Sequence, residues 1–187
     1  MSMIGKEVSD FSVQAFHQDD FKTVTKADLV GKWSVFVFYP ADFTFVCPTE
    51  LGDLADQYDA FKKLGCEIYS ISTDTHFTHK AWHDESATIK KVTFPMLADP
   101  AHVLCRDFDV LIEADGVAER GTFVINPEGV IVAYEVNAGS VGRSASELLR
   151  RVEASQYVAT HSDQACPANW KPGAATLEPG INLVGAI

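Results

Sequence analysis

The sequence predicts an α/β fold in which a mixed central sheet is flanked by helices and followed by an extended C-terminal tail. Strand and helix patterns alternate over residues 33–90, and a hairpin signal follows between residues 120 and 136. The chain has 187 residues, which suits one domain and would be short for two. Hydrophobic residues make up 47% of the chain, and this proportion excludes a disordered protein.

The first predicted strand and helix lie between residues 33 and 64. Residues 33–39 read WSVFVFY, an almost continuous apolar run that is typical of a strand buried on both faces. Residues 48–64 carry apolar side chains at spacings of three or four, which predicts a helix with one buried face. These side chains are Leu51, Leu54, Tyr58 and Phe61. Gly65 is expected to end this helix.

A second strand and a second helix are predicted over residues 66–72 and 74–90. Asp74 or Thr75 is expected to cap this helix, because both side chains can accept a hydrogen bond from its first free amides. A short helix is expected around Cys105.

A hairpin and a final helix complete the predicted domain. Residues 120–125 and 130–136 are expected to pair, because the Asn-Pro-Glu-Gly sequence between them is a good turn signal. The sequence Ser-Ala-Ser-Glu at residues 144–147 is a capping box that opens a helix. The strands and helices together predict an α/β sandwich around a mixed sheet.

The last 27 residues, from His161, differ from the rest of the chain because they show no clear periodicity. They are rich in residues that interrupt regular structure, namely Pro167, Pro172, Gly173, Pro179, Gly180 and Gly185. We therefore expect residues 1–160 to form one domain and residues 161–187 to form a tail. Such a tail can reach up to roughly 3.3 Å per residue from its own domain.

The charge and cysteine content exclude several classes of protein. With 15 Lys and Arg against 26 Asp and Glu, the net charge of −11 argues against a nucleic-acid or anionic-membrane binder. No signal peptide is visible, and the longest apolar run is too short to span a bilayer. The four cysteines include no Cys-x-x-Cys pair, and there is no Gly-rich phosphate loop. We expect a cytoplasmic protein with free thiols and no bound cofactor.

Cys47 is the first candidate for chemistry. It follows a buried strand and a short loop and directly precedes a helix that begins at Pro48, so its sulfur is placed where free amides and the helix dipole favour a thiolate. The alternative interpretation is a small buried hydrophobic residue, which is the usual role of a cysteine. The position at the end of a central strand favours a functional role.

The sequence resembles the peroxiredoxin family over nearly its whole length, and three segments carry the resemblance most clearly. Pro40, Thr44 and Cys47 match its Pro-x-x-x-Thr-x-x-Cys signature. The segments FYPADFTFVCPTE at residues 38–50, STDTHFTHKAW at 72–82 and CPANW at 166–170 resemble the typical two-cysteine subgroup, and most closely its bacterial alkyl hydroperoxide reductase branch. This resemblance implies a thioredoxin-like fold.

The resemblance also implies a set of roles around Cys47, which would be the peroxidatic thiolate. Arg120 would stabilise the thiolate and the charge that leaves on oxygen, and Thr44 would contact both sulfur and peroxide. Pro40 would keep bulk water off the sulfur. Glu50 and Arg143 match positions that orient the first arginine.

A comparison of magnitudes indicates where the rate comes from. A thiol with an ordinary pKa of ~8.5 is about 3% ionised at pH 7, so complete ionisation gains at most ~30-fold. Enzymes accelerate reactions by ~10⁶ or more. Most of the rate must therefore come from alignment of the peroxide and stabilisation of the developing oxygen charge. We expect Arg120, Thr44 and the loop amides to provide both effects.

Cys166, on the tail, can be interpreted as a surface cysteine without a role or as a resolving thiol. An exposed thiol on a flexible arm suits the second role, because it must reach a new sulfenic acid. The resemblance implies that Cys166 of one subunit pairs with Cys47 of another in a head-to-tail dimer, and that dimers assemble into a decamer. It also implies hydroperoxide substrates and, as electron donor, a flavoprotein disulfide reductase or a thioredoxin.

The remaining cysteines and a set of histidines have simpler interpretations. Cys66 and Cys105 have apolar neighbours and are predicted to be core residues. His76, His79 and His83 lie at spacings that could share a helix face, but no further ligand completes a metal site, so we expect none. Two other functions stay open, a holdase chaperone assembly and a redox sensor that uses the same cysteine.

Overall fold

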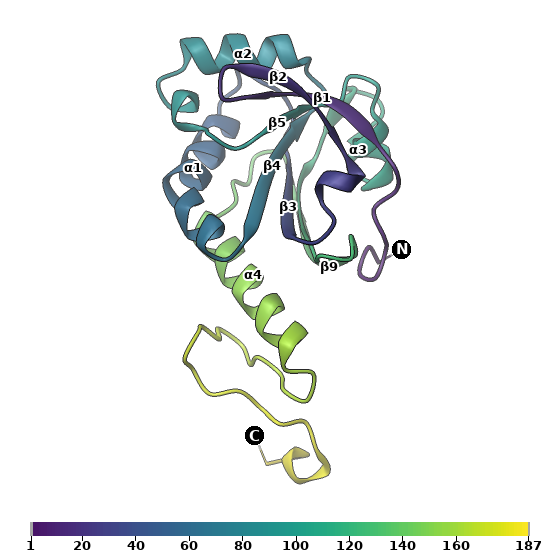
Figure 1. Cartoon of the computed structure of the whole chain (residues 1–187), viewed down its shortest axis with the longest axis vertical. Coiled ribbons are helices and arrows are strands. Elements are labelled where there is room, and N and C mark those ends of the chain that lie inside the picture. Colours follow the sequence, from purple (N-terminus) through teal and green to yellow (C-terminus); the bar gives the residue numbers. More distant parts are fainter. Residues whose placement is uncertain (1, 187) are drawn as a thin grey trace. The chain divides into compact units, whose positions relative to one another are not determined.

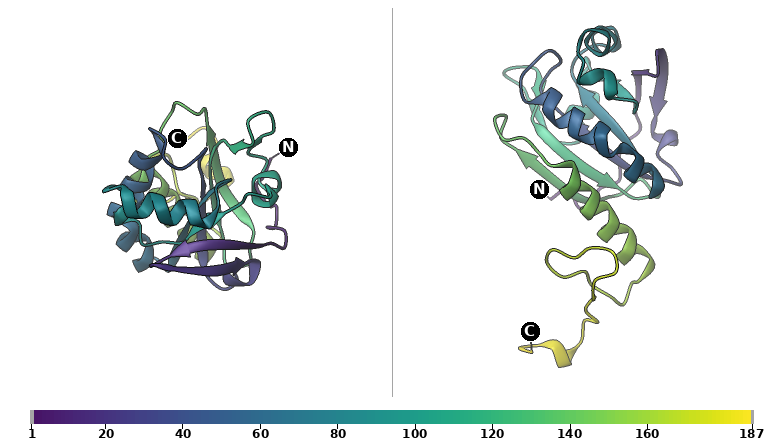
Figure 2. Two further views of the ribbon diagram at one scale, coloured as in Figure 1. Left: turned by 90° about the horizontal axis from the view of Figure 1, so that it is seen from above. Right: turned by 90° about the vertical axis from the view of Figure 1, so that its left-hand side faces the viewer.

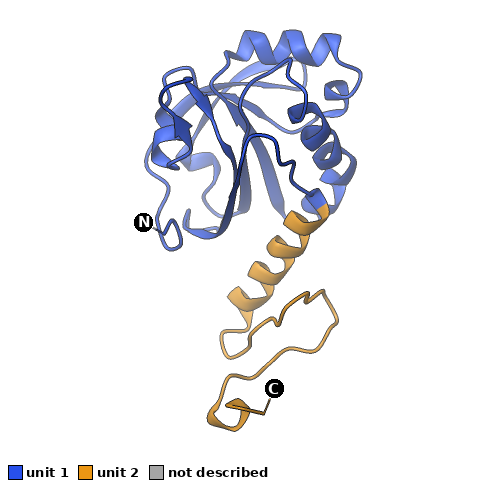
Figure 3. Ribbon diagram, turned by 180° about the vertical axis from the view of Figure 1, so that it is seen from behind, with its two compact units in different colours: residues 1–145 blue, residues 146–187 orange. Residues whose placement is uncertain are grey.

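The structure, a computed structural model, describes residues 2–186 (Figure 1). The chain divides into two compact units, residues 1–145 and residues 146–187 (Figure 3). The boundary expected from the sequence lies one helix later, after residue 160. The difference is helix α4 (Ala145–Thr160), which makes contacts with the segment that follows it, including a 3.5 Å hydrogen bond from Arg150 Nη1 to the Trp170 carbonyl.

The first unit is built on a seven-stranded mixed sheet with the strand order β2-β1-β5-β4-β3-β8-β9 (Figure 1). The strands are β1 (Ser12–His17), β2 (Asp20–Thr25), β3 (Trp33–Phe38), β4 (Cys66–Ser72), β5 (Met96–Ala98), β8 (Arg120–Ile125) and β9 (Ile131–Asn137). Strands β3, β4 and β5 are parallel, while β8 and β1 join them as antiparallel neighbours. The predicted central strands and the predicted hairpin of β8 and β9 are confirmed.

Helices cover both faces of this sheet. Helices α1 (Cys47–Lys63) and α2 (His76–Glu85) lie on one face and α3 (Val103–Asp107) on the other (Figure 2). The connections from β3 to β4 and from β4 to β5 both step across the sheet in the same direction. Because such crossovers are right-handed, they place α1 and α2 on the same face. Short 3₁₀ helices, η1 (Lys26–Asp28) and η2 (Ile89–Lys91), and a two-stranded ribbon of β6 (Leu111–Ile112) and β7 (Val117–Ala118) complete the unit.

The alternation of side chains along β3 determines what lies at its carboxyl end. Phe36 and Phe38 point into an aromatic cluster with Phe108 and Phe123, with ring centroids 4.8–6.3 Å apart. The next residue, Tyr39, points to the opposite face, where its ring lies 6.1 Å from that of Trp82 in α2. The loop that leads to Cys47 therefore starts from a packed strand.

Two features of the first unit differ from the sequence prediction. Strands β1 and β2 form a hairpin that was not predicted, because its turn residues Gln18 and Asp19 adopt positive φ angles of 51° and 62° without the glycine that usually marks such a turn. Helix α2 is shorter than residues 74–90. It ends at Glu85 because Ser86 is extended, while its start is capped by Thr75 as predicted.

The second unit consists of α4 and a segment that has little regular structure, as expected. An isolated bridge pairs Ala165 with Leu177, and a 3₁₀ helix, η3, covers Ile181–Leu183. Trp170 is buried, with its ring 4.9 Å from that of Tyr157, and its indole donates to the Ala174 carbonyl. The segment after α4 is therefore folded back on a small aromatic core of its own.

Candidate active site

Cys47 is the first residue of α1, and its side chain is fully buried. Pro48 occupies the first turn, and the amides of Thr49 and Glu50 both donate to the Val46 carbonyl. The preceding loop contains Phe43 in a left-handed conformation, with φ 55°. The sulfur therefore lies where a strand, a strained loop and a helix N-terminus meet.

Thr44, in the same loop, contacts the sulfur directly. Its Oγ1 lies 2.9 Å from Cys47 Sγ and 2.8 Å from the Ala41 carbonyl oxygen. A hydroxyl has one hydrogen, so Thr44 donates to only one of these two acceptors at a time. It can donate to the sulfur when Cys47 is a thiolate, or to a peroxide oxygen that lies beside it.

Arg120 approaches the sulfur from β8, the strand next to β3. Its Nη1 lies 3.4 Å from Cys47 Sγ and 2.7 Å from Glu50 Oε2, while its Nε donates to the Gly139 carbonyl. Burial lowers the pKa of Arg120, but the hydrogen bond that Arg120 donates to Cys47 and the charge of Glu50 outweigh this effect and raise the pKa above its ordinary value. Arg120 is therefore a permanent cation in contact with the sulfur.

Glu50 joins Arg120 to a second arginine, Arg143. Glu50 Oε1 accepts from both the backbone amide and Nε of Arg143, and Oε2 accepts from Nη2 of Arg143. Arg143 also donates to the Gly121 carbonyl and to Thr122 on β8. The Arg120, Glu50 and Arg143 side chains are each 3–5% exposed. Glu50 thus holds both guanidinium groups in fixed positions, which is the arrangement that a charged site needs.

The structure therefore brings five of the seven residues chosen from the sequence into one cluster, namely Thr44, Cys47, Glu50, Arg120 and Arg143. Pro40, half-buried, begins the loop that carries Thr44 and leads to Cys47. The seventh, Cys166, belongs to the second unit. The Gly139 carbonyl, which holds Arg120 Nε, was not predicted, because no sequence pattern marks a backbone acceptor from a distant loop.

Cys166 is half-buried beside the Ala165–Leu177 bridge. Partial burial raises the pKa of its thiol, and the positive charge of Arg150 acts in the opposite direction. The thiol is therefore mostly protonated at neutral pH.

Cys66 and Cys105 are buried, and their chemistry differs from that of a reactive thiol. Burial, followed by the charge of Glu67, raises the pKa of Cys66 to about 12. Burial and the charge of Asp99 also raise the pKa of Cys105. Both therefore stay protonated and packed in the core, and only a thiolate is a good nucleophile.

The three histidines of α2 do not share one site. His79 is fully buried, with Nδ1 2.7 Å from Asp42 Oδ2 and Nε2 3.0 Å from the Leu97 carbonyl oxygen. His76 packs its ring against Phe77, and His83 Nε2 faces the Val92 carbonyl. Packing against the sheet therefore gives each histidine a different partner.

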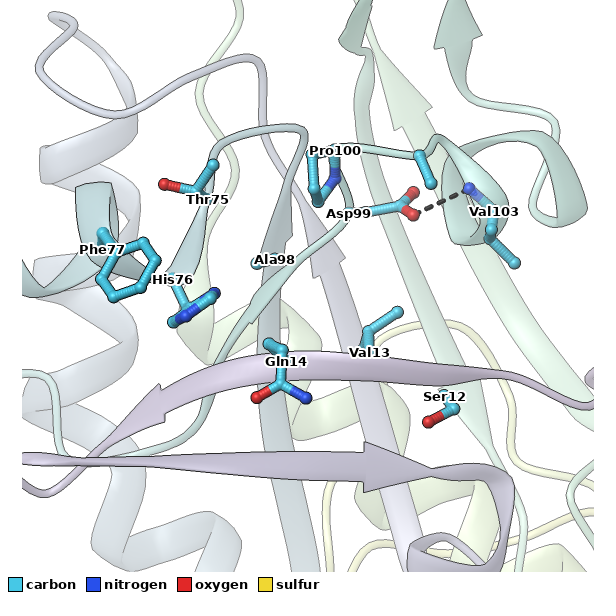
Figure 4. A pocket seen from close by; sticks show the side chains of 11 residues that line it. Ser12, Val13, Gln14, Thr75, His76, Phe77, Ala98, Asp99, Pro100 and Val103 are labelled. Atoms are coloured by element: carbon cyan, nitrogen blue, oxygen red, sulfur yellow. Dashed lines mark hydrogen bonds between the residues drawn. The ribbon is translucent and has the colours of Figure 1, made fainter.

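A pocket of about 260 Å³ lies elsewhere in the first unit, between β1, the start of α2 and the segment after β5 (Figure 4). Its lining includes Gln14, His76, Phe77 and Val103, and the Asp99 carboxylate beside it accepts from the Val103 amide. None of the residues that contact Cys47 line it. Of the helices within residues 2–186, none has the length and apolar character needed to cross a membrane.

Comparisons with known proteins identify the family of this chain. The model of the AhpC/TSA family matches residues 4–134, and the model of the C-terminal domain of 1-Cys peroxiredoxin matches residues 154–181. The chain is 56% identical to alkyl hydroperoxide reductase C of Salmonella typhimurium and of Bacillus subtilis, and 54% identical to that of Escherichia coli. Each of these matches covers 100% of both chains.

Solved structures give the same result. The crystal structure of Enterococcus faecalis AhpC has a TM-score of 0.87 and 51% identity, and covers 89% of this chain and 100% of that one. The reduced 2-Cys peroxiredoxin of Plasmodium vivax has a TM-score of 0.92 and 31% identity, covering 97% and 96%. The fold is therefore the thioredoxin-like fold of the peroxiredoxins. This chain belongs to the AhpC/TSA family, and within it to the AhpC-type 2-Cys peroxiredoxins.

Proposed function

We propose that this protein is a thiol peroxidase that reduces hydrogen peroxide and small organic hydroperoxides with the Cys47 thiolate. One observation carries the proposal: Thr44 Oγ1 and Arg120 Nη1 lie 2.9 Å and 3.4 Å from the same sulfur. A hydroxyl and a fixed cation are thus aimed at the place where a peroxide must lie to react. Family membership and the relatives named alkyl hydroperoxide reductase C support the same activity.

The reaction is a displacement at oxygen. The Cys47 thiolate attacks one peroxide oxygen, an S–O bond forms, and the O–O bond breaks. Cys47 becomes a sulfenic acid, and the other oxygen leaves as hydroxide or alkoxide and takes a proton to give water or an alcohol. Negative charge moves from sulfur to the leaving oxygen, so Arg120, in contact with the sulfur, is placed to stabilise the charge through the transition state.

The cycle continues with Cys166 of a second subunit. Its thiolate attacks the Cys47 sulfur, an S–S bond forms, and hydroxide leaves. Cys47 is fully buried, so the first turn of α1 must open before another thiol can reach the sulfur. The intersubunit disulfide is then reduced by a partner dithiol, either a flavoprotein disulfide reductase or a thioredoxin.

Assembly is the second part of the proposal. Phe43, Phe77 and Val103 are 56%, 64% and 47% exposed in the first unit, and Phe77 and Val103 line the same pocket. Contacts between dimers through these residues would build the decamer. The same exposed surface favours a holdase activity as a second candidate function, since unfolded proteins bind to apolar surface.

The test is peroxide consumption by the purified protein with a disulfide reductase or a thioredoxin system. Wild type is expected to turn over, and Cys47→Ser to show none. Non-reducing electrophoresis after peroxide is expected to give a dimer that is missing in Cys166→Ser. A monomeric oxidised band would reject the intersubunit disulfide, and poor turnover with every reductant would favour a redox sensor. Client protection that survives in Cys47→Ser would establish the holdase activity separately.

A further inference from the structure

A buried polar network lies beneath the loop that carries Thr44, and it makes no contact with Cys47. Its centre is Asp42, whose side chain is fully buried. Oδ1 accepts from the Tyr39 hydroxyl at 2.7 Å, Oδ2 lies 2.7 Å from His79 Nδ1, and the Asp42 amide donates to Asp74 Oδ2 at 2.8 Å. The loop is thereby joined to the residue that follows β3, to α2 and to the segment between β4 and α2.

The partners of this network determine where its protons are. The Leu97 carbonyl oxygen can only accept, so His79 Nε2 carries a hydrogen. Burial, followed by the charge of Asp42, raises the pKa of Tyr39 well above its usual value, so its hydroxyl stays a donor. One proton must then lie between His79 Nδ1 and Asp42 Oδ2, because otherwise two lone pairs would face each other at 2.7 Å without water.

The loop needs such an anchor because it is strained next to Asp42. Phe43 has φ 55°, a left-handed conformation that costs about 1–3 kcal/mol for a residue other than glycine. Its ring is 56% exposed, so burial does little to hold it there. The bonds of Asp42 therefore hold the loop, because the Thr44 hydroxyl gives up its bond to the Ala41 carbonyl when it donates to the Cys47 sulfur.

We propose that Asp42 and His79 are positioning residues for the peroxidase reaction, which hold the strained loop so that the Thr44 hydroxyl stays at the Cys47 sulfur. The inference rests on the proposed peroxidase function. Asp42 and His79 touch neither the sulfur nor the peroxide, so they act through the loop. The sequence shows His79 only as one of three regularly spaced histidines, and its contact with Asp42 gives it this role.

The proposal predicts that loss of the pair affects two reactions of Cys47 differently. Reduction of hydrogen peroxide needs both the thiolate and the aligned Thr44 hydroxyl, whereas alkylation by iodoacetamide needs only an accessible thiolate. Asp42→Ala is expected to lower the rate constant for peroxide by about 100-fold, the usual effect of a small misplacement of a reacting group. The rate of alkylation is expected to stay unchanged or to rise as the loop opens.

Two substitutions of His79 separate its two contacts. In His79→Asn the amide occupies the place of Nδ1 and can still donate to Asp42, while in His79→Gln the longer side chain keeps the contact with the Leu97 carbonyl. We expect His79→Gln to lose about 100-fold in peroxide rate and His79→Asn to recover most of that loss. Asp42→Asn, which can accept from Tyr39 and donate to a neutral His79, is the matching conservative variant for Asp42.

Asp99→Ala is the matched control, because Asp99 is also a buried carboxylate that accepts two hydrogen bonds, from the amides of Val103 and Cys105. It is expected to lower stability in denaturant while the ratio of peroxide to alkylation rates stays at the wild-type value. A parallel fall of both rates in the Asp42 and His79 variants would overturn the proposal, as would equal rates in His79→Asn and His79→Gln. Failure of the peroxidase function itself would be seen first, in wild type compared with Cys47→Ser.

Discussion

Replacement of Arg120 by alanine tests whether this residue accelerates the reaction by ionising Cys47 or by stabilising the transition state. When Cys47 is in its reactive thiolate form, the buried cluster holds two guanidinium cations, Arg120 and Arg143, and two anions, the Glu50 carboxylate and the thiolate. Arg120→Ala removes one cation and leaves a buried negative charge without compensation, which disfavours the thiolate. It also removes the group that lies 3.4 Å from the sulfur, where charge develops in the transition state.

These two effects respond differently to pH. A thiol of ordinary pKa is ~30-fold less ionised at neutral pH than a fully ionised one, and burial without a neighbouring cation lowers the ionised fraction further, but this loss disappears above the pKa of the thiol. Loss of a positioned group that stabilises developing charge typically costs about 10²–10³-fold. Rate constants for peroxide, measured by stopped flow over a pH series, separate the two, because the ionisation effect vanishes on the alkaline plateau. We expect Arg120→Ala to stay at least about 100-fold below wild type on that plateau.

Two further variants make the test specific. Arg120→Ala combined with Glu50→Gln restores the balance of one cation and one anion, so it is expected to recover ionisation without recovering the plateau rate. Arg106→Ala is the control, because it removes a half-exposed arginine paired with Glu113 at the surface. Equal plateau rates for Arg120→Ala and wild type would refute the reasoning, because Arg120 would then act only by ionising Cys47.

Further predictions concern the other thiols and Thr44. Thr44→Val keeps the shape of the side chain but removes the hydroxyl 2.9 Å from the sulfur, so the peroxide rate is expected to fall about 100-fold and to recover in Thr44→Ser; an unchanged rate would remove Thr44 from the mechanism. Because the pKa of Cys166 is raised, the rate of disulfide formation from oxidised protein is expected to rise about tenfold per pH unit from neutral pH towards that pKa. Mass spectrometry after rapid quenching measures this rate, and a rate that does not change with pH would contradict the prediction. Cys66→Ser and Cys105→Ser each bury a hydroxyl and are expected to lower the free energy of unfolding by about 1–3 kcal/mol, with peroxide turnover kept; loss of turnover at unchanged stability would contradict their role as core residues.

The sequence by itself determined the local elements around the reactive thiol. The apolar run before residue 40 forms β3, Pro48 lies in the first turn of α1, and Cys47 stands between them. These features depend on neighbouring residues only, so composition and spacing were enough to predict them. The motif around Cys47 then led, by resemblance, to Arg120, Glu50 and Arg143, whose roles remain proposals.

Only the tertiary structure decided which distant groups meet. Arg120 reaches the sulfur across 73 residues of sequence because β8 pairs with β3, and Arg143 reaches Glu50 across 93 residues. Helical spacing placed His76, His79 and His83 on one face, yet packing buries His79 against Asp42 and leaves the other two with different partners. Local spacing specifies a face of a helix, whereas the partner across that face is set by strand pairing and packing far away in the sequence.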